Sequence, residues 1–317
     1  KMFIPSRKLG DKHIIRGGVT MKKVLSILVV LSLISTMLIG CGKEKDKDNK
    51  NTNTNTKTEV TTTTTEEKQE TVTLNVAYMP NYAALNTVVA AVETGALEEQ
   101  GIKVNLIEFA DGPTIIAAME SGSVDVGYIG HGAHKLAIQG KAKIIAPAHY
   151  SKAEEVIGNR DKGVNSIEDL RGKTIAMASG TSSETVLDLT LKQAGLTKDD
   201  VVLMDMDASA IVTAMISGSV DAAATWSPNT FAIKEALGDK ANMLTNNGMF
   251  IDEAPSIGSW IVAPEYLDKN EALVKRFLTG LFEGYDFRAT NHEETSEWVA
   301  KQVALEYDSV YQQREDA

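Results

Sequence analysis

Residues 118–125 read AMESGSVD and residues 214–221 read AMISGSVD, so one octapeptide occurs twice with a single difference. Each copy ends a helical stretch, and its glycine suits the left-handed conformation found after a helix. Short β-rich stretches alternate with helical ones around both copies, which predicts parallel strands with helical crossovers. Because both copies fall at the same point of two βαβαβ units, we expect two homologous α/β lobes rather than one enlarged sheet.

The elements of each unit follow from apolar patterning and glycine stops. In the first unit we predict strands over 74–78, 104–109 and 124–129, with helices over 83–94 and from 112 to about 122. In the second we predict strands over 173–178, 201–206 and 220–225, with helices over 184–194 and 209–217. Strands over 155–159 and 256–262 are expected to form a two-crossing hinge. The predicted domains are lobe one at 72–158, lobe two at 159–255, and a return to lobe one at 256–317 that contains helices over 270–288 and 293–305.

Composition excludes several classes of protein. The 317 residues carry a formal net charge of −11, and no basic stretch is long enough to bind a nucleic acid. The single cysteine, Cys41, can build neither a disulfide framework nor a cysteine-based zinc site.

The N-terminal part has the pattern of an export signal. Lys22 and Lys23 precede an uncharged, mostly apolar run over 24–39, which ends at Gly40 and Cys41. This order resembles the bacterial lipobox, so we expect a signal peptide over 21–40 and a lipid anchor on Cys41 that holds the protein on the extracytoplasmic face of the cell membrane. The alternative is an ordinary anchor helix that ends at a cysteine. We interpret 1–20 as an upstream start assigned too early, and the Thr-, Asn- and Lys-rich stretch 41–71 as a flexible tether.

Loops at the carboxyl ends of the strands are the expected binding site, because ligands of parallel α/β sheets lie there. Loops from both lobes would face one cleft. The candidate ligand-binding residues in these loops are Asn81, Tyr82, Gly112, Gly130, His131, Gly180, Thr181, Ser182, Ser183, Asp207 and Trp226.

The loop 179–184 is the most informative of these. Thr181 and Glu184 have capping-box spacing, and small residues with free N–H groups at a helix start suit an oxyanion held without a counter-ion. An ordinary cap without ligand is the alternative. Asp111 and Asp207 are interpreted as caps, with pairing of one of them to an ammonium group left open. For Asp125 and Asp221 a turn or cap role is favoured over ligand contact.

The two histidines of the first lobe are ambiguous. His131 either donates to an anion or merely ends a strand, and His134 with His131 is too weak a pattern for a metal site. Tyr82 and Trp226 either contact the ligand in the cleft or belong to the core, and for Trp226 a position in the cleft is favoured. No metal, cofactor or catalytic residue is predicted.

From residue 74 to about 228 the chain resembles the binding proteins of aliphatic sulfonate, taurine and nitrate importers, whose relatives include proteins that bind thiamine-pyrimidine precursors. The resemblance rests on the segments 109–113, 180–183 leading to 193–196, and 220–222 leading to 226–228. It implies an extracytoplasmic component of an ABC importer with permease and ATPase partners. A monomer is expected. The resemblance also implies that Gly130, the loop 180–183 and Trp226 line the ligand site, and that closing helices of lobe one beyond Ala317 are missing.

The functional hypothesis is therefore capture of a small solute by closure of two lobes. The expected solute is an organosulfonate, taurine or a nitrate-like anion. The alternatives are a thiamine-pyrimidine precursor or another small heterocycle bound by the same fold, an enzyme on this fold, and a lipoprotein with a structural or adhesive role. The sequence has no Gly-x-Ser-x-Gly elbow and no Walker phosphate loop, which disfavours the enzyme.

Overall fold

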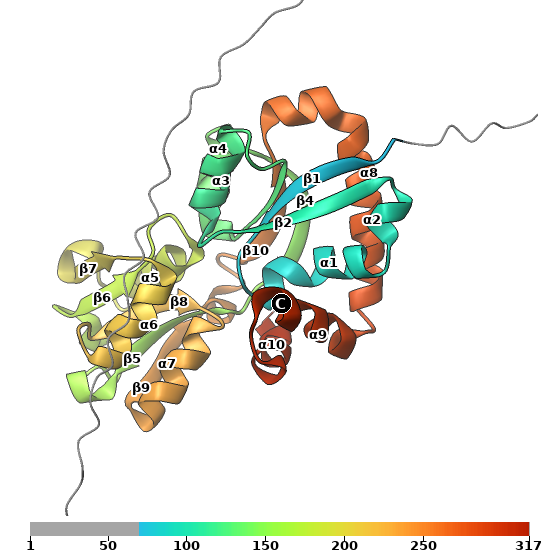
Figure 1. Cartoon of the computed structure of the whole chain (residues 1–317). Helices are drawn as coiled ribbons and strands as arrows, with labels where there is room; N and C mark the ends of the chain where they lie inside the picture. Colours follow the sequence, from blue (N-terminus) through green and yellow to red (C-terminus); the bar gives the residue numbers. More distant parts are fainter. Residues whose placement is uncertain (1–69, 317) are drawn as a thin grey trace, which may run out of the picture. The chain divides into compact units, whose positions relative to one another are not determined.

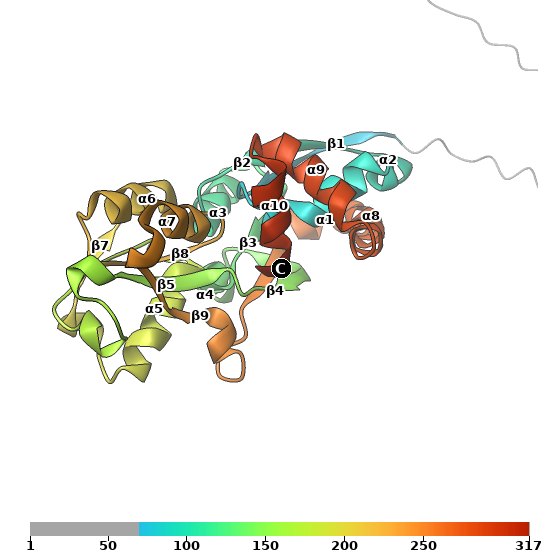
Figure 2. The ribbon, with the colours of Figure 1, turned by 90° about the horizontal axis from the view of Figure 1, so that it is seen from below.

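The computed structural model describes residues 70–316. The predicted upstream start, signal peptide, Cys41 lipidation site and nearly all of the predicted tether lie outside these residues. Among 70–316, no helix has the length and apolar character that crossing a membrane requires. Two separate five-stranded sheets organise this part of the chain, and Figures 1 and 2 show the helices grouped around each.

The first lobe is built on the sheet β2-β1-β3-β10-β4. Strand β1 runs parallel to β2 and β3, whereas β10 is antiparallel to both β3 and β4. The strands are β1 (Val72–Tyr78), β2 (Ile102–Glu108), β3 (Val126–Ile129), β4 (Lys143–Tyr150) and β10 (Ile257–Val262). The helices are α1 (Tyr82–Glu93), α2 (Ala96–Glu99), α3 (Gly112–Glu120), α4 (His134–Ile138), α8 (Pro264–Arg288), α9 (His292–Val303) and α10 (Tyr307–Gln313).

The second lobe repeats this pattern on the sheet β7-β6-β8-β5-β9. Strand β6 is parallel to β7 and β8, and β5 is antiparallel to β8 and β9. The strands are β5 (Glu154–Asn159), β6 (Thr174–Met177), β7 (Val202–Asp205), β8 (Ala222–Trp226) and β9 (Ala241–Asn246), and the helices are α5 (Ser182–Gln193), α6 (Ala208–Ser217) and α7 (Asn229–Leu237). The predicted two-lobed α/β class is confirmed, with two antiparallel strands added to each βαβαβ unit.

The core of the second lobe shows why its strands read as nearly continuous apolar runs. Ile175 and Met177 pack on one face of the sheet with apolar residues of α5, while Ala176 packs on the other with residues of α6 and α7. Successive side chains of a strand point to opposite faces, so a central strand covered by helices on both sides needs apolar residues at every position. The first lobe buries a core of its own, in which Trp260 and Phe277 meet edge to face.

The strand 155–159, expected to end lobe one, instead lies inside the second sheet as β5. The chain therefore enters the second lobe between Tyr150 and Glu154, earlier than the expected boundary at 158. The sequence analysis also missed β4, β9 and α10. Both strands are sheet edges that carry exposed or half-buried residues at most positions and, unlike the edge strands β2 and β7, lie outside the repeated βαβαβ units.

The repeated octapeptide forms the same turn in both lobes. Gly122 and Gly218 adopt φ of +78° and +72°, as expected for glycines that end helices. The carboxylate of Asp125 accepts a 2.8 Å hydrogen bond from the Asn75 N–H in β1, and that of Asp221 accepts one of 2.9 Å from the Thr174 N–H in β6. Each aspartate thus fastens the helix–strand turn to the neighbouring strand, which agrees with the structural interpretation.

We predict that Asp125→Ala and Asp221→Ala destabilise the protein by similar amounts. Each substitution leaves a part-buried backbone N–H without its partner, which costs roughly 1–3 kcal/mol. Urea denaturation measures the free energy of unfolding of both variants, with Asp239→Ala at an exposed position as the control. A lower free energy of unfolding in only one of the two variants would contradict the equivalence of the two turns.

Candidate functional site

The two segments that connect the lobes lie next to each other. The Ser151 N–H donates a 2.9 Å hydrogen bond to the carbonyl of Ser256, so the first crossing is bound to the second. The Lys152 N–H donates to the carbonyl of Asp316, also at 2.9 Å. The end of the described chain therefore fastens the crossings as well.

A cavity opens beside these crossings, with a volume of about 40 Å³ for the centres of water-sized molecules. Residues of both lobes and of the first crossing line it. They are Met79, Asn81, Ala83, Gly112, Pro113, Tyr128, Gly130, Ala133, Ser151, Ala153, Glu154, Thr181, Ser182, Trp226, Ser227 and Gln313.

Six of the eleven candidate residues line this cavity: Asn81, Gly112, Gly130, Thr181, Ser182 and Trp226. Five do not: Tyr82, His131, Gly180, Ser183 and Asp207. For each of the five, a physical reason explains why it lies outside the lining.

Tyr82 begins α1 with its side chain fully buried in the core of the first lobe. Ser183 is also fully buried, and its hydroxyl donates to the carbonyl of Ala178. Asp207 is exposed at the start of α6, makes no side-chain cap, and lies on the outer loop of its lobe. Asp111 does cap its helix, because its carboxylate accepts from the Thr114 N–H at 2.8 Å.

Glu154 is the lining residue that the sequence analysis missed most clearly. It is 5% exposed and begins β5, where its carboxylate accepts a 2.9 Å hydrogen bond from the Ser151 hydroxyl and another from the Asn247 amide. Burial raises the pKa of Glu154, and the hydroxyls of Ser182 and Ser151 oppose this shift. An acidic residue directly before an apolar strand was the available sequence signal.

Aromatic side chains and an amide supply other walls of the cavity. Tyr128, in β3, is buried beneath the cavity, and its hydroxyl lies 3.3 Å from Nε2 of His149. Trp226, at the end of β8, is 8% exposed. Gln313, in α10, uses its side-chain oxygen to accept a 2.9 Å hydrogen bond from the Tyr82 N–H. Apolar rings with a few fixed polar groups are typical of a site for a small organic molecule.

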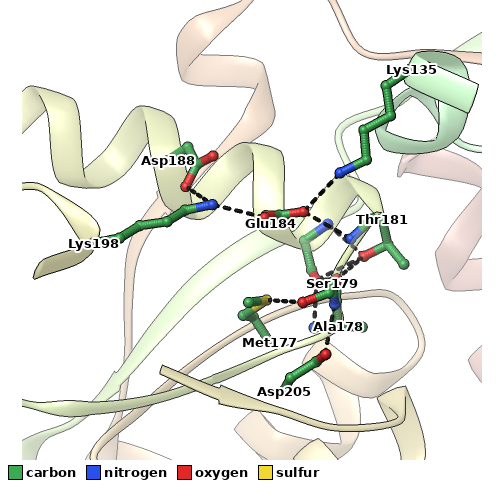
Figure 3. Close-up of polar contacts among 11 residues, drawn as sticks. Lys135, Met177, Ala178, Ser179, Thr181, Glu184, Asp188, Lys198 and Asp205 are labelled. Carbon is green, nitrogen blue, oxygen red and sulfur yellow. Dashed lines mark hydrogen bonds and ion pairs between the residues drawn. The ribbon is translucent and has the colours of Figure 1, made fainter. Parts of the chain in front are cut away.

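The loop 179–184, predicted to bind an oxyanion, already binds two carboxylates of the protein. Figure 3 shows Glu184 between two lysines and beside the loop. The Gly180 N–H donates to Glu184 at 2.8 Å, and the Ser179 N–H donates to Asp205 at 2.8 Å. The oxyanion prediction is corrected for these two donors, since the protein's own acidic side chains occupy them.

Glu184 in turn forms ion pairs with two lysines. Lys135 in α4 of the first lobe lies 3.2 Å from Glu184, and Lys198 of the second lobe lies 2.7 Å from it. The pKa of Glu184 falls to about 2; burial opposes this, and the hydrogen bonds from Lys198, the Gly180 N–H and Lys135 outweigh it. The ion pair with Lys135 is therefore a contact between the lobes.

A backbone contact between the lobes lies close to this ion pair. Gly132 is part of a short 3-10 helix, His131–Ala133, at the end of β3. A Cβ atom built on Gly132 would fall well under 3.0 Å from backbone atoms of Thr181 and Ser182. Only a glycine at this position lets the first lobe approach the start of α5 so closely.

His131 contacts the second crossing rather than the cavity. Its Nδ1 shares a hydrogen bond with the Ser256 hydroxyl, and burial lowers the pKa of His131 to about 4. The ring is therefore neutral at pH 7 and supplies no positive charge to an anion. Within residues 70–316, no group of three or more metal-ligating side chains is found.

We predict that His131 makes the protein less stable in acid. The unfolded chain binds a proton at this histidine below about pH 6.5, whereas the folded protein binds it only near pH 4. The free energy of unfolding therefore falls as pH decreases from about 6.5 to 4. The buried Glu154 acts in the opposite sense, so the effect is read from the difference between variants.

Urea denaturation at pH 7 and pH 5 tests this dependence. His131→Gln is expected to lose less stability than the wild type between these pH values, while His292→Gln, at an exposed position, is expected to behave like the wild type. An equal loss in His131→Gln and the wild type would contradict the role of His131.

Two homologous α/β lobes, two crossings and a cavity between them define a protein with the fold of the two-lobed binding proteins. The chain belongs to the NMT1/THI5-like family, which matches residues 83–295. It is 35% identical over 233 residues to a Brucella abortus protein described in its name only as a binding protein, covering 73% of this chain and 72% of that one. It is 26% identical to the taurine-binding periplasmic protein of Escherichia coli, over 66% of this chain and 64% of that one.

Solved structures share the fold. The alkanesulfonate-binding protein of Xanthomonas axonopodis pv. citri, bound to MOPS, superposes with a TM-score of 0.65 at 22% identity, over 78% of this chain and 85% of that one. A desulfurization enzyme, at 16% identity over 76% of this chain and 85% of that one, gives a TM-score of 0.55. The fold alone therefore separates neither ligands nor binding from catalysis.

Proposed function

We propose that this protein captures a small solute outside the cytoplasm and delivers it to a membrane importer. The observation that carries the proposal is a cavity lined from both lobes beside two crossings. A ligand in such a cavity contacts both lobes at once, so it favours the conformation in which the lobes meet.

The relatives support an organosulfonate, taurine or a nitrate-like anion as the solute. Taurine and aliphatic sulfonates stand in the names of matched proteins, and one matched solved structure is that of a periplasmic nitrate-binding protein. A second candidate is a small heterocycle such as a thiamine-pyrimidine precursor. The buried rings of Tyr128 and Trp226 favour it, as does the absence of lysine and arginine from the described part of the cavity lining.

The proposal extends to the partners of the protein. A matched Staphylococcus aureus structure is described as the ligand-binding component of an ABC-type import system, which supports a permease and an ATPase as partners here. The order of charged, apolar and cysteine residues over 22–41 supports a lipid anchor on Cys41. We further propose that the protein acts as a monomer.

Binding rather than catalysis is the proposed role. No cysteine other than Cys41 is available as a nucleophile, and the matched relatives named above are binding proteins. A thermal-shift panel of nitrate, taurine, alkanesulfonates and aminopyrimidines tests the proposal, because a ligand that binds only the folded state raises the melting temperature. Saturable binding without turnover is the expected result, and turnover of the bound compound would favour an enzyme.

We predict that Gly132→Ala weakens ligand binding without unfolding either lobe. The added methyl group clashes with backbone atoms of Thr181 and Ser182 only when the lobes meet, so the closed form alone is destabilised. Isothermal titration with the strongest ligand of the panel is expected to show at least a tenfold loss of affinity. Gly140→Ala, at a glycine with no atoms near the added carbon, is the control for the alanine itself.

Gly140 has a φ of +86°, so its substitution strains the backbone without touching the second lobe. Equal affinity in Gly132→Ala and the wild type would show that the contact at Thr181 is not needed for binding.

We predict a smaller effect for Lys135→Gln. The ion pair between Lys135 and Glu184 joins the lobes, but an exposed pair stabilises by only about 0.2–1 kcal/mol, which corresponds to a loss of affinity of up to about fivefold. Lys198→Gln is a matched control, because Lys198 contacts Glu184 and Asp188 within the second lobe. Stopped-flow measurement is expected to show faster ligand release in Lys135→Gln alone, and equal release rates in both variants would contradict a contact that stabilises closure.

A further inference from the structure

Glu154 differs from the other carboxylates around the cleft in its partners. It is 5% exposed, and its hydrogen-bond partners are neutral: Ser151, Asn247 and the hydroxyls of Ser182 and Ser256. Within residues 70–316, no ion pair involves Glu154. A buried carboxylate without a counter-ion is costly, so its presence in a cavity calls for a compensating group.

The neighbouring carboxylates do have counter-ions. Glu155, the next residue, pairs with Lys234 at 2.8 Å, and Glu184 pairs with Lys135 and Lys198. Within residues 70–316, the chain therefore supplies a cation to these two carboxylates of the second lobe but none to Glu154, which lines the cavity.

The rest of the lining adds no positive charge. Among the residues of 70–316 that line the cavity there is no lysine, arginine or histidine. Two N–H donors of the loop before α5, those of Ser179 and Gly180, already bind Asp205 and Glu184. A ligand whose charge is only negative would thus approach a carboxylate with no cation in the lining to offset the repulsion, whereas an ammonium group or a protonated ring nitrogen would be attracted.

We infer that Glu154 is a specificity-determining residue that binds an ammonium or comparable N–H donor group of the solute, so that the cleft selects amino-bearing compounds. The inference rests on the proposed function, since it assigns a chemical class to the solute of the same cavity. Within the range of solutes suggested by the relatives, it favours an amino sulfonate over a simple alkanesulfonate, and an aminopyrimidine over an alkylated one.

Two pairs of compounds test the inference, because the members of each pair differ in one amino group. Taurine is compared with propane-1-sulfonate, in which a methyl group replaces the ammonium. The second pair is 4-amino-2-methylpyrimidine and 2,4-dimethylpyrimidine. Isothermal titration of the wild-type protein is expected to show at least tenfold tighter binding of the amino member in one or both pairs.

Glu154→Gln separates charge from shape, since the amide keeps an oxygen that accepts from Ser151. It is expected to lose at least tenfold affinity for the amino member and to bind the methyl member as well as the wild type or better. Glu155→Gln is the matched control: it removes the adjacent carboxylate, which pairs with Lys234 and does not line the cavity. The ratio of its affinities for the amino and the methyl member of each pair is expected to equal that of the wild type.

If Glu154 only stabilises the crossings and does not bind the ligand, a different result is expected. Glu154→Gln would then lower the melting temperature of the ligand-free protein while leaving the ratio of affinities unchanged, and this outcome overturns the inference. Preference of the wild type for the methyl members overturns it as well, without any need for a variant. In both cases saturable binding remains, so solute capture survives.

Failure of the proposed function has another signature. If neither pair of compounds, nor nitrate, nor the longer alkanesulfonates bind saturably, the proposed function is wrong. This inference then fails together with it.

Discussion

The buried carboxylate of Glu154 lies where the first crossing, the second sheet and the cavity meet. It accepts hydrogen bonds from Ser151 in the crossing and from Asn247 at the end of β9, so one charged group holds together segments 93 residues apart in sequence. Polar groups at such a junction fix geometry only when their hydrogen bonds are satisfied. The donors to this carboxylate are neutral, and within residues 70–316 no cation pairs with it.

The charges around the cleft explain why a fold shared with sulfonate-binding proteins need not share their ligand. Of the acidic residues of the second lobe, Glu154 lines the cavity, while Lys135 and Lys198 are bound to Glu184 and Lys234 is bound to Glu155. Helix starts attract anions, but in the loop before α5 the N–H groups of Ser179 and Gly180 already bind carboxylates of the chain, so these two donors offer little to another anion. The ligand class is therefore determined by side chains placed on the fold rather than by the fold itself.

The sequence predicted the fold far better than the site. The repeated octapeptide, glycine stops and apolar runs located the central strands of both sheets, because burial on both faces requires continuous apolar residues. The edge strands β2 and β7 were also located, because they belong to the repeated βαβαβ units, whereas the edge strands β4 and β9 lie outside these units and were missed. Gln313 was beyond reach of sequence reasoning, since its place beside the cavity depends on tertiary packing between α10 and α1, including the bond to the Tyr82 N–H. The orientation of Tyr82 likewise depends on packing, because a helix start has both a cleft side and a core side.

Comparison of the two lobes explains the error at Asp207. The ends of β1 and β6 are equivalent, and each supplies a cap residue, Asn81 or Thr181, that lines the cavity. The ends of β2 and β7 are also equivalent, but only the first reaches the cavity, through Gly112. The second lobe instead faces the first through the start of α5, at the backbone contact of Thr181 with Gly132, which leaves its outer loop in solvent. Duplication thus gives the two lobes equal turns but unequal access to the cavity. A site residue that is inferred in one lobe from its equivalent in the other has to be checked against the contact between the lobes.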